Sequence, residues 1–189
     1  MKQEEVILKN GLKVVGDAFD KTDFKSLQII FNEWLQINKK LKNLGGRNLN
    51  VPDVFSEALF CLAFDAVRTN ATAHSYDCVM RKTGEGVQVK SASIPNDCTS
   101  FGPTSSWDLL YFADFVPNKT VDGQVNFYKI DDSDIYNLVL NSKKNETFRD
   151  QQKQGRRPRF SLQNTIIKPK KLKPERIVNL VDGTIITPK

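Results

Sequence analysis

The chain has 189 residues, of which 39% are hydrophobic and 26% are charged, and its formal net charge is +6. This length and composition suit one domain with a buried core, and they exclude a disordered chain, a collagen-like chain and a disulfide miniprotein. No stretch is apolar enough for a membrane span or a signal peptide, and an odd number of cysteines favours reduced thiols, so we expect a cytoplasmic protein with no membrane partner.

The N-terminal part predicts a short hairpin followed by a long helix. Residues 6–15 alternate around Asn10-Gly11, a strong turn signal. Thr22 can cap an amphipathic helix that runs to about Leu44, where two glycines end it. Its apolar stripe suits either a helix docked on a core or a self-associating coiled coil, and we expect the docked helix.

A second helix is predicted from Pro52, which suits a first helical turn, to about Arg68. Apolar residues cover most of its circumference, which indicates a buried helix. Glu57 lies in its middle, and a buried carboxylate is strongly unfavourable unless a cation or hydrogen-bond donors meet it. We therefore expect Glu57 to have a partner, either a structural Arg or Lys or a metal ion.

The remaining elements are expected to be mainly strands. A buried central strand is predicted at 107–116, because the stretch is mainly apolar and aromatic. The other predicted elements are strands at 75–80, 86–92, 124–130 and 160–167, a short helix capped by Asp131 or Ser133, a loop or exposed helix at 143–155, a connector at 168–174 and a hairpin at 177–186 around Asp182-Gly183.

Positive charge is concentrated near the C-terminus. Residues 143–176 hold twelve Lys and Arg against three Asp and Glu, a net charge of +9, which leaves −3 for the rest of the chain. Such a segment is typical of a protein with a polyanionic partner, most often nucleic acid, although a solvated basic surface has the same composition.

Three polar residues are predicted to share one face of a β-hairpin. Pairing around the turn at 83–84 places Asp77 opposite Lys90, with Gln88 two residues earlier in the same strand. Because side chains alternate along a strand, all three project from one face. Asp77, the Gln88 side-chain oxygen and Glu57 can hold Mg²⁺, which prefers oxygen ligands, and Lys90 can orient a water or stabilise charge on a phosphate.

Asp77 followed by Gln88-Val89-Lys90, with Glu57 on the preceding helix, resembles the signature of the PD-(D/E)xK nuclease superfamily. Two residues depart from it. Tyr76 replaces the proline, and Gln88 replaces the middle acid, which weakens the negative charge at the metal. Glu85 is a rival acid, but its turn position points it elsewhere.

Several neighbouring blocks resemble a small family of type II restriction endonucleases that cut the interrupted palindrome GCNGC. These blocks are SEALFC at 56–61, VRTN at 67–70, SYDC at 75–78, GEGVQVK at 84–90 and CTSFGP at 98–103. The resemblance implies an α/β (α+β) fold, with a mixed central sheet flanked by helices. It also implies Mg²⁺-dependent cleavage of double-stranded DNA in a prokaryotic restriction–modification system, and a homodimer that matches the two-fold symmetry of the site.

On this basis residues 1–189 form a single endonuclease domain. We divide it into an N-terminal hairpin and helix (1–48), a catalytic core (50–142) and a basic DNA-contacting segment (143–189). In the basic segment, Arg156, Arg157 and Arg159 precede a predicted strand, and Arg can read guanine bidentately or bind phosphate. The other DNA-binding candidates are Asn70, Ser100 and Lys168.

Two alternatives remain at this stage. A structure-selective repair nuclease has the same chemistry, and a non-catalytic basic DNA-binding module has the same charge. A binding module has no use for Asp77, Gln88 and Lys90 on one face, which favours a nuclease. His74 with the three cysteines fits no usual zinc-site spacing.

Overall fold

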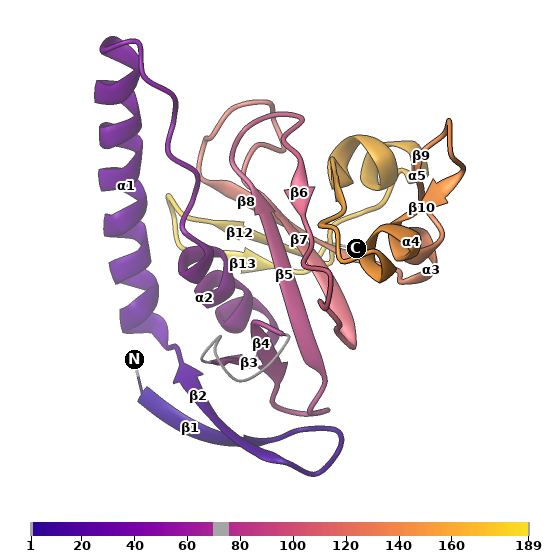
Figure 1. Ribbon diagram of the computed structural model, residues 1–189. Helices are drawn as coiled ribbons and strands as arrows, with labels where there is room; N and C mark the ends of the chain where they lie inside the picture. The colour runs from indigo at the N-terminus through magenta and orange to yellow at the C-terminus, as the bar shows by residue number, and fades with distance from the viewer. Residues whose placement is uncertain (1, 70–75, 189) are drawn as a thin grey trace.

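A computed structural model describes residues 2–69 and 76–188, and Figure 1 shows helices packed against a curled mixed sheet. The described part has nine strands in this sheet, in the order β1-β2-β3-β4-β5-β7-β8-β12-β13. Their bounds are β1 (Lys2–Ile7), β2 (Lys13–Ala18), β3 (Ala66–Thr69), β4 (Cys78–Met80), β5 (Gly86–Ala92), β7 (Leu109–Asp114), β8 (Gln124–Ile130), β12 (Arg176–Asn179) and β13 (Ile185–Ile186). β5 and β7 pair in parallel and the other neighbouring strands pair antiparallel, so the expected mixed sheet with helices is confirmed.

Two helices, α1 (Lys21–Asn43) and α2 (Asp53–Phe64), precede most of the sheet in the chain. A group of short elements lies on the other side of the sheet in Figure 1. They are α3 (Ser133–Tyr136), β9 (Val139–Asn141), β10 (Glu146–Thr147), α4 (Phe148–Lys153), β11 (Arg159–Phe160), the π-helix η1 (Gln163–Ile167) and α5 (Lys168–Lys170). β9 pairs with β10, and β11 pairs with β6 (Thr99–Ser100), which follows β5.

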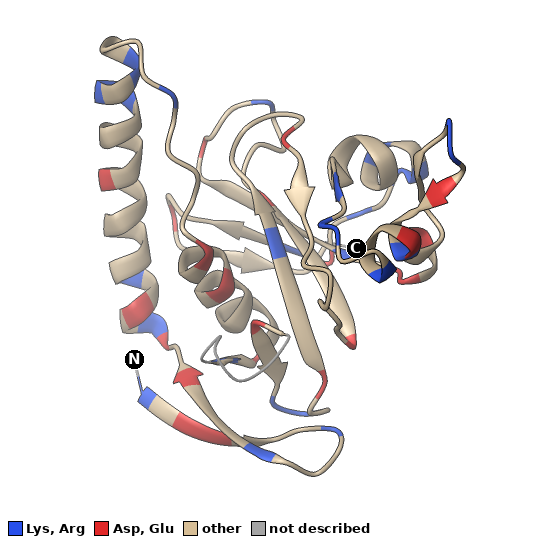
Figure 2. Ribbon diagram, viewed as in Figure 1, with Lys and Arg blue, Asp and Glu red and all other residues tan. Residues whose placement is uncertain are grey.

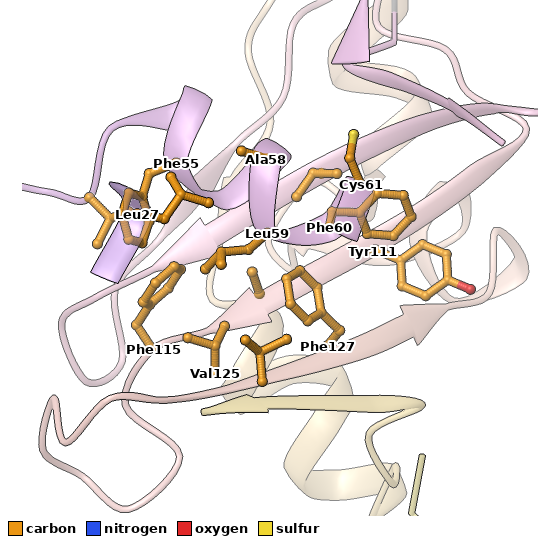
Figure 3. Packing of buried hydrophobic residues seen from close by; sticks show 14 of the residues in the cluster. Leu27, Phe55, Ala58, Leu59, Phe60, Cys61, Tyr111, Phe115, Val125 and Phe127 are labelled. Atoms are coloured by element: carbon orange, nitrogen blue, oxygen red, sulfur yellow. The ribbon is translucent and has the colours of Figure 1, made fainter. Parts of the chain in front are cut away.

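Each face of the sheet is covered by its own apolar cluster. α1 and α2 pack their aromatic and aliphatic side chains onto one face, and Figure 3 shows Leu59, Phe60 and Phe127 at the centre of this cluster. The opposite cluster includes Phe101 and Phe112. In the strand predicted at 107–116, observed as β7, residues 109–113 are all apolar or aromatic because their two sets of side chains enter different clusters.

The first hairpin and the long helix are confirmed, with one difference at the start of the helix. The expected cap was Thr22, but the N-cap residue is Asp20, whose carboxylate accepts hydrogen bonds from the backbone N–H groups of Thr22 and Asp23. The Asp23 side chain accepts in return from the Asp20 backbone N–H. This reciprocal capping box explains why α1 begins before Thr22.

The prediction of a helix from Pro52 to about Arg68 is wrong in its last turn. α2 ends at Phe64, because Asp65 adopts a left-handed conformation with φ of 54°. The chain then continues as β3, and its fully buried Val67 pairs with Val79. A continuous apolar run does not distinguish a buried helix from a buried strand, and here it contains both.

The strand predicted at 160–167 is also largely wrong. Only Phe160 of this stretch lies in a strand, β11, and residues 163–167 form the π-helix η1. Leu162 and Ile166 are both buried but Asn164 between them is exposed, which suits a helix and not a strand, where all three would share one face. The basic stretch at 143–155 contains both β10 and α4, and the connector at 168–174 begins with the single turn of α5.

The hairpin predicted at 177–186 is confirmed, since Ile177 pairs with Ile186. β12 pairs with β8, and β13 follows it as the edge strand of the main sheet. Within the described residues, no helix combines the length and the apolar character that crossing a membrane requires.

Candidate active site

The hairpin that carries Asp77 has a different register from the expected one. Cys78 pairs with Val87 and Val79 with Gly86, so Asp77 lies beside Gln88 and not opposite Lys90. The strand itself is shorter than predicted: β4 begins at Cys78, and Asp77 directly precedes it. The shift is by two residues, and a two-residue shift returns each side chain to the same face. The predicted sharing of one face by Asp77, Gln88 and Lys90 therefore survives the wrong register.

Two donors from β5 hold the Asp77 carboxylate. Its Oδ2 accepts a 2.8 Å hydrogen bond from the Val89 backbone N–H and a second hydrogen bond from the Gln88 side-chain amide. Gln88 is buried and meets Asp77 through its amide nitrogen. In this arrangement Gln88 fixes the carboxylate of Asp77.

A polar cleft of about 270 Å³ lies where α2, the start of β4, β5 and the β6 segment meet. Its lining includes Glu57, Asp77, Lys90, Ser100 and Arg157 among the residues that the sequence singled out, and Gln88 is not part of it. The other lining residues are Asn50, Asp53, Val89, Ser91, Asp97, Cys98 and Thr99. The structure thus brings together residues that lie 100 positions apart in the chain.

Sequence reasoning missed two acids of this cleft, Asp53 and Asp97. Asp53 lies one helical turn before Glu57, so the spacing of four residues on a predicted helix was a usable signal. No comparable signal was available for Asp97, because it lies between strands and its position depends on how the chain returns to the sheet.

Burial raises the pKa values of both carboxyl groups at the cleft floor. For Asp77, desolvation outweighs the hydrogen bond from the Val89 N–H and the attraction of the Lys90 ammonium group. For Glu57, desolvation outweighs its hydrogen bond with Arg68, and the Asp77 charge raises the pKa further. Two carboxylates that resist ionisation beside each other form a site that a cation would stabilise.

Glu57 has the cationic partner that its burial predicted. The Nε atom of Arg68 donates to its Oε2 at 2.6 Å, and the same guanidinium donates to Asp17 on β2 at 3.1 Å. Arg68 is able to face Glu57 because it lies on β3 and not on the same helix. One guanidinium therefore ties α2 to two strands and holds Glu57 at the cleft.

The Lys90 side chain is placed by an aromatic ring. Its ammonium nitrogen lies 5.6 Å from the ring centroid of Phe101, which is fully buried. An ammonium group over an aromatic face is attracted by the ring quadrupole. Phe101 in turn is anchored by a 3.0 Å hydrogen bond from its N–H to the Pro158 carbonyl. The basic segment therefore helps to position Lys90, through the contact of Pro158 with Phe101.

The carboxylate oxygens of this cleft suit Mg²⁺ as ligands, but they do not supply a full coordination shell from protein alone. Among the residues that the structure describes, no group of three His, Cys, Asp or Glu side chains could hold a metal ion. Mg²⁺ is usually held by one or two carboxylates together with water and substrate phosphate oxygens. Glu57 and Asp77 meet that requirement, because each has a second carboxylate oxygen that accepts no hydrogen bond from the described residues.

The three arginines of the basic segment have different surroundings. Arg157 lines the cleft, and Arg159 on β11 is exposed opposite Ser100 on β6. Arg156 instead forms an ion pair with Glu146, and this guanidinium lowers the pKa of Glu146 to about 2. The structure therefore places Arg157 and Ser100 in the cleft lining, pairs Arg159 with Ser100, and assigns Arg156 a structural contact.

Lys168 lies farther along the basic segment. Its ammonium group donates to the Asn164 side chain at 2.8 Å and to the Asn96 side chain at 3.3 Å, and it is exposed. Figure 2 shows basic residues spread over the C-terminal group of short elements, with acidic residues among them. The predicted DNA contact Asn70, and His74, lie outside the described residues.

Comparison with known proteins gives one consistent result. The family model described as "Bsp6I restriction endonuclease" matches residues 19–169. The type II restriction enzyme Bsp6I of Bacillus sp. (strain RFL6) is 32% identical over 170 residues, which is 88% of this chain and 94% of that enzyme. No solved structure matches the chain.

Proposed function

The chain belongs to the Bsp6I restriction endonuclease family, and from that premise we propose that it cuts double-stranded DNA at a specific sequence by Mg²⁺-dependent hydrolysis. Family membership confirms the expected enzyme class, a restriction endonuclease. The observation that carries the proposed chemistry is the cleft in which Glu57, Asp77 and Lys90 meet.

The arrangement of elements around the cleft supports a PD-(D/E)xK-type fold. Glu57 lies on α2, Asp77 directly precedes β4, and Lys90 lies on the neighbouring strand β5. This is the distribution that the sequence signature predicts. The parallel pairing of β5 with β7 adds the mixed sheet expected for that fold.

In the proposed mechanism, Glu57 and Asp77 would hold Mg²⁺, and the bound ion would supply Lewis-acid chemistry, polarising a phosphate and lowering the pKa of a water. Lys90 donates a hydrogen bond to the attacking water or to the phosphate oxygen on which charge develops. Gln88 keeps the Asp77 carboxylate fixed, a role that its amide nitrogen favours over that of a metal ligand. Arg157 binds a DNA phosphate at the cleft edge.

We propose GCNGC as the recognition sequence and a homodimer as the active form. The sequence blocks around the motif support the site, and its two-fold symmetry calls for two equivalent subunits. Arg159 is the candidate for reading guanine, because a guanidinium can bond guanine O6 and N7 together, whereas Arg157 is assigned to a phosphate. Arg156 is a weaker candidate, since its guanidinium already forms an ion pair with Glu146.

Digestion of supercoiled plasmid DNA with the purified chain and Mg²⁺ tests this function, with a chelator control and a synthetic four-way junction as the competing substrate. Discrete fragments of the plasmid, absent with chelator, are the expected result. Preferential cutting of the junction would replace the proposal with a structure-selective nuclease. A gel shift without any cutting would leave a DNA-binding module.

A further inference from the structure

One face of α1 carries large apolar side chains that the described part of the chain leaves uncovered. Ile30 and Ile37 are 45% and 46% exposed, and Leu44 is 84% exposed. Trp34 and Leu41, which lie between them in the sequence, are only partly buried. Figure 1 shows that the C-terminal half of α1 extends beyond the sheet, next to the connection to α2.

These five residues have the spacing of a coiled-coil seam. Positions 30, 34, 37, 41 and 44 follow steps of four, three, four and three, which is the a/d repeat of a heptad. At 1.5 Å per residue, the seam is about 21 Å long. The helix meets its own core mainly with another stripe, the buried residues Phe24, Leu27, Phe31 and Asn38. Trp34 borders both stripes, because its ring stacks on Phe31 and its indole N–H donates to the Leu49 carbonyl at 3.2 Å. α1 therefore has more apolar surface than docking on its own core requires.

We propose that this seam, composed of Ile30, Trp34, Ile37, Leu41 and Leu44, docks against the same seam of a second copy of the chain, with the two α1 helices antiparallel. The inference rests on the homodimer of the proposed function and assigns it a surface. An isologous contact of this kind closes on itself, as a dimer with two-fold symmetry must.

The charges beside the seam favour an antiparallel pair of identical helices. Glu33 and Lys40 are both exposed, lie seven residues apart on the solvent side of the seam and form no ion pair with any described residue. In an antiparallel pair, Glu33 faces the partner's Lys40, and symmetry makes this contact twice. A parallel pair would instead bring the lysine-rich ends of the two helices, at residues 39–42, together.

Sedimentation of the full chain at several concentrations tests the surface. A seam of this length is short, so we expect association that depends on concentration and ionic strength. Ile37→Lys, at the middle of the seam, should give a monomer with an unchanged circular dichroism spectrum. Ile29→Lys is the matched control, because Ile29 is 60% exposed on the same helix but lies off the seam, and this variant should dimerise like the wild type.

A charge-exchange experiment tests the identity and direction of the partner. Glu33→Lys and Lys40→Glu should each weaken self-association, by about tenfold for two repelling pairs. Mixing the two variants should restore the wild-type affinity, because each then supplies the charge that the other lacks. A mixture no tighter than either variant alone would overturn the antiparallel arrangement.

The remaining outcomes separate this inference from the proposed function. A monomeric wild type, or an Ile37→Lys variant that dimerises normally, would overturn the assigned surface, whatever the DNA cleavage result. A wild-type dimer that depends on the seam but cuts no DNA would support the surface and contradict the proposed function. Plasmid digestion with the same preparations provides the second readout.

Discussion

At the residue scale, a small number of hydrogen-bond donors positions the carboxylates of the cleft. Asp77 is fixed by Val89 and Gln88, and Glu57 is fixed by Arg68. The sequence predicted that Asp77, Gln88 and Lys90 share a face, because the alternation of a strand is insensitive to a two-residue error in register. It did not predict which side-chain atom of Gln88 meets Asp77, which is determined by the local hydrogen bonds.

Lys90→Ala should remove cleavage and retain DNA binding. The ammonium group acts on developing charge at the phosphate, and loss of one such donor typically lowers the rate by about 10²–10³-fold. The measurement is single-turnover cleavage of a short duplex beside a gel-shift titration. Equal losses of binding and cleavage would contradict the proposed role of Lys90.

Arg157→Ala should weaken DNA binding and lower the slope of log affinity against log salt by about one, as expected for one phosphate contact. Arg156→Ala is the matched control, because its guanidinium is held by Glu146. We expect that control to lower the thermal unfolding temperature and to leave the salt slope unchanged. A salt slope that changes in the control and not in Arg157→Ala would reverse the assignment.

At the scale of elements, the predicted secondary structure is wrong where one element gives way to another and no Gly or Pro marks the boundary. Asp65 ends α2 in a left-handed conformation, and no feature of its neighbours marks it as a helix end. The region after Phe160 forms a π-helix, in which Gln163 donates to the buried Asp114 of β7. Gln163 and Asp114 are 49 residues apart in the sequence, so no local sequence pattern could predict their contact.

Gly84→Ala should destabilise the turn between β4 and β5. Gly84 has φ of +70°, and an added Cβ would lie 2.5 Å from the carbonyl oxygen of Ile7, where backbone cannot yield. Gly11→Ala is the control, with φ of +84° and no atom within 4 Å. Both variants force an alanine into a positive φ, at a cost of about 1–2 kcal/mol, so the larger loss of unfolding free energy in Gly84→Ala measures the steric clash. Chemical denaturation of both variants checks this prediction, and equal losses would contradict the contact.

Asp114→Asn should change the pH dependence of stability. Burial raises the pKa of Asp114, so the folded state holds the proton more tightly than the unfolded state does. Stability from this group is therefore fully present below the ordinary value of 3.8 and falls as pH rises toward the raised pKa. Asparagine does not ionise, so the variant does not lose this stability as pH rises. The Gln163 side chain can rotate so that its amide oxygen accepts a hydrogen bond from the new asparagine. The variant should melt higher than the wild type near neutral pH, and the two should converge below pH 3.8. A difference that grows on acidification would contradict the raised pKa.

At the scale of the whole molecule, the sequence predicted a mixed sheet with helices, but not the order of its strands. The final strands β12 and β13 return to the main sheet beside β8, and β6 pairs with β11 across 59 positions at Ser100 and Arg159. These long-range pairings bring Arg157 into the cleft with Asp77. The composition of the cleft could be predicted from motifs only in part, because its walls come from segments that only the fold brings together.

The central claim is that this cleft hydrolyses DNA at a defined sequence. The most direct test is to digest genomic DNA with the wild type and Mg²⁺, using unmethylated and cytosine-methylated DNA, and to sequence all new ends, with Lys90→Ala as the control. We expect ends confined to GCNGC in at least one of the two DNAs, and none above background in the variant. Ends scattered over unrelated sequences, or the same ends produced by Lys90→Ala, would contradict it.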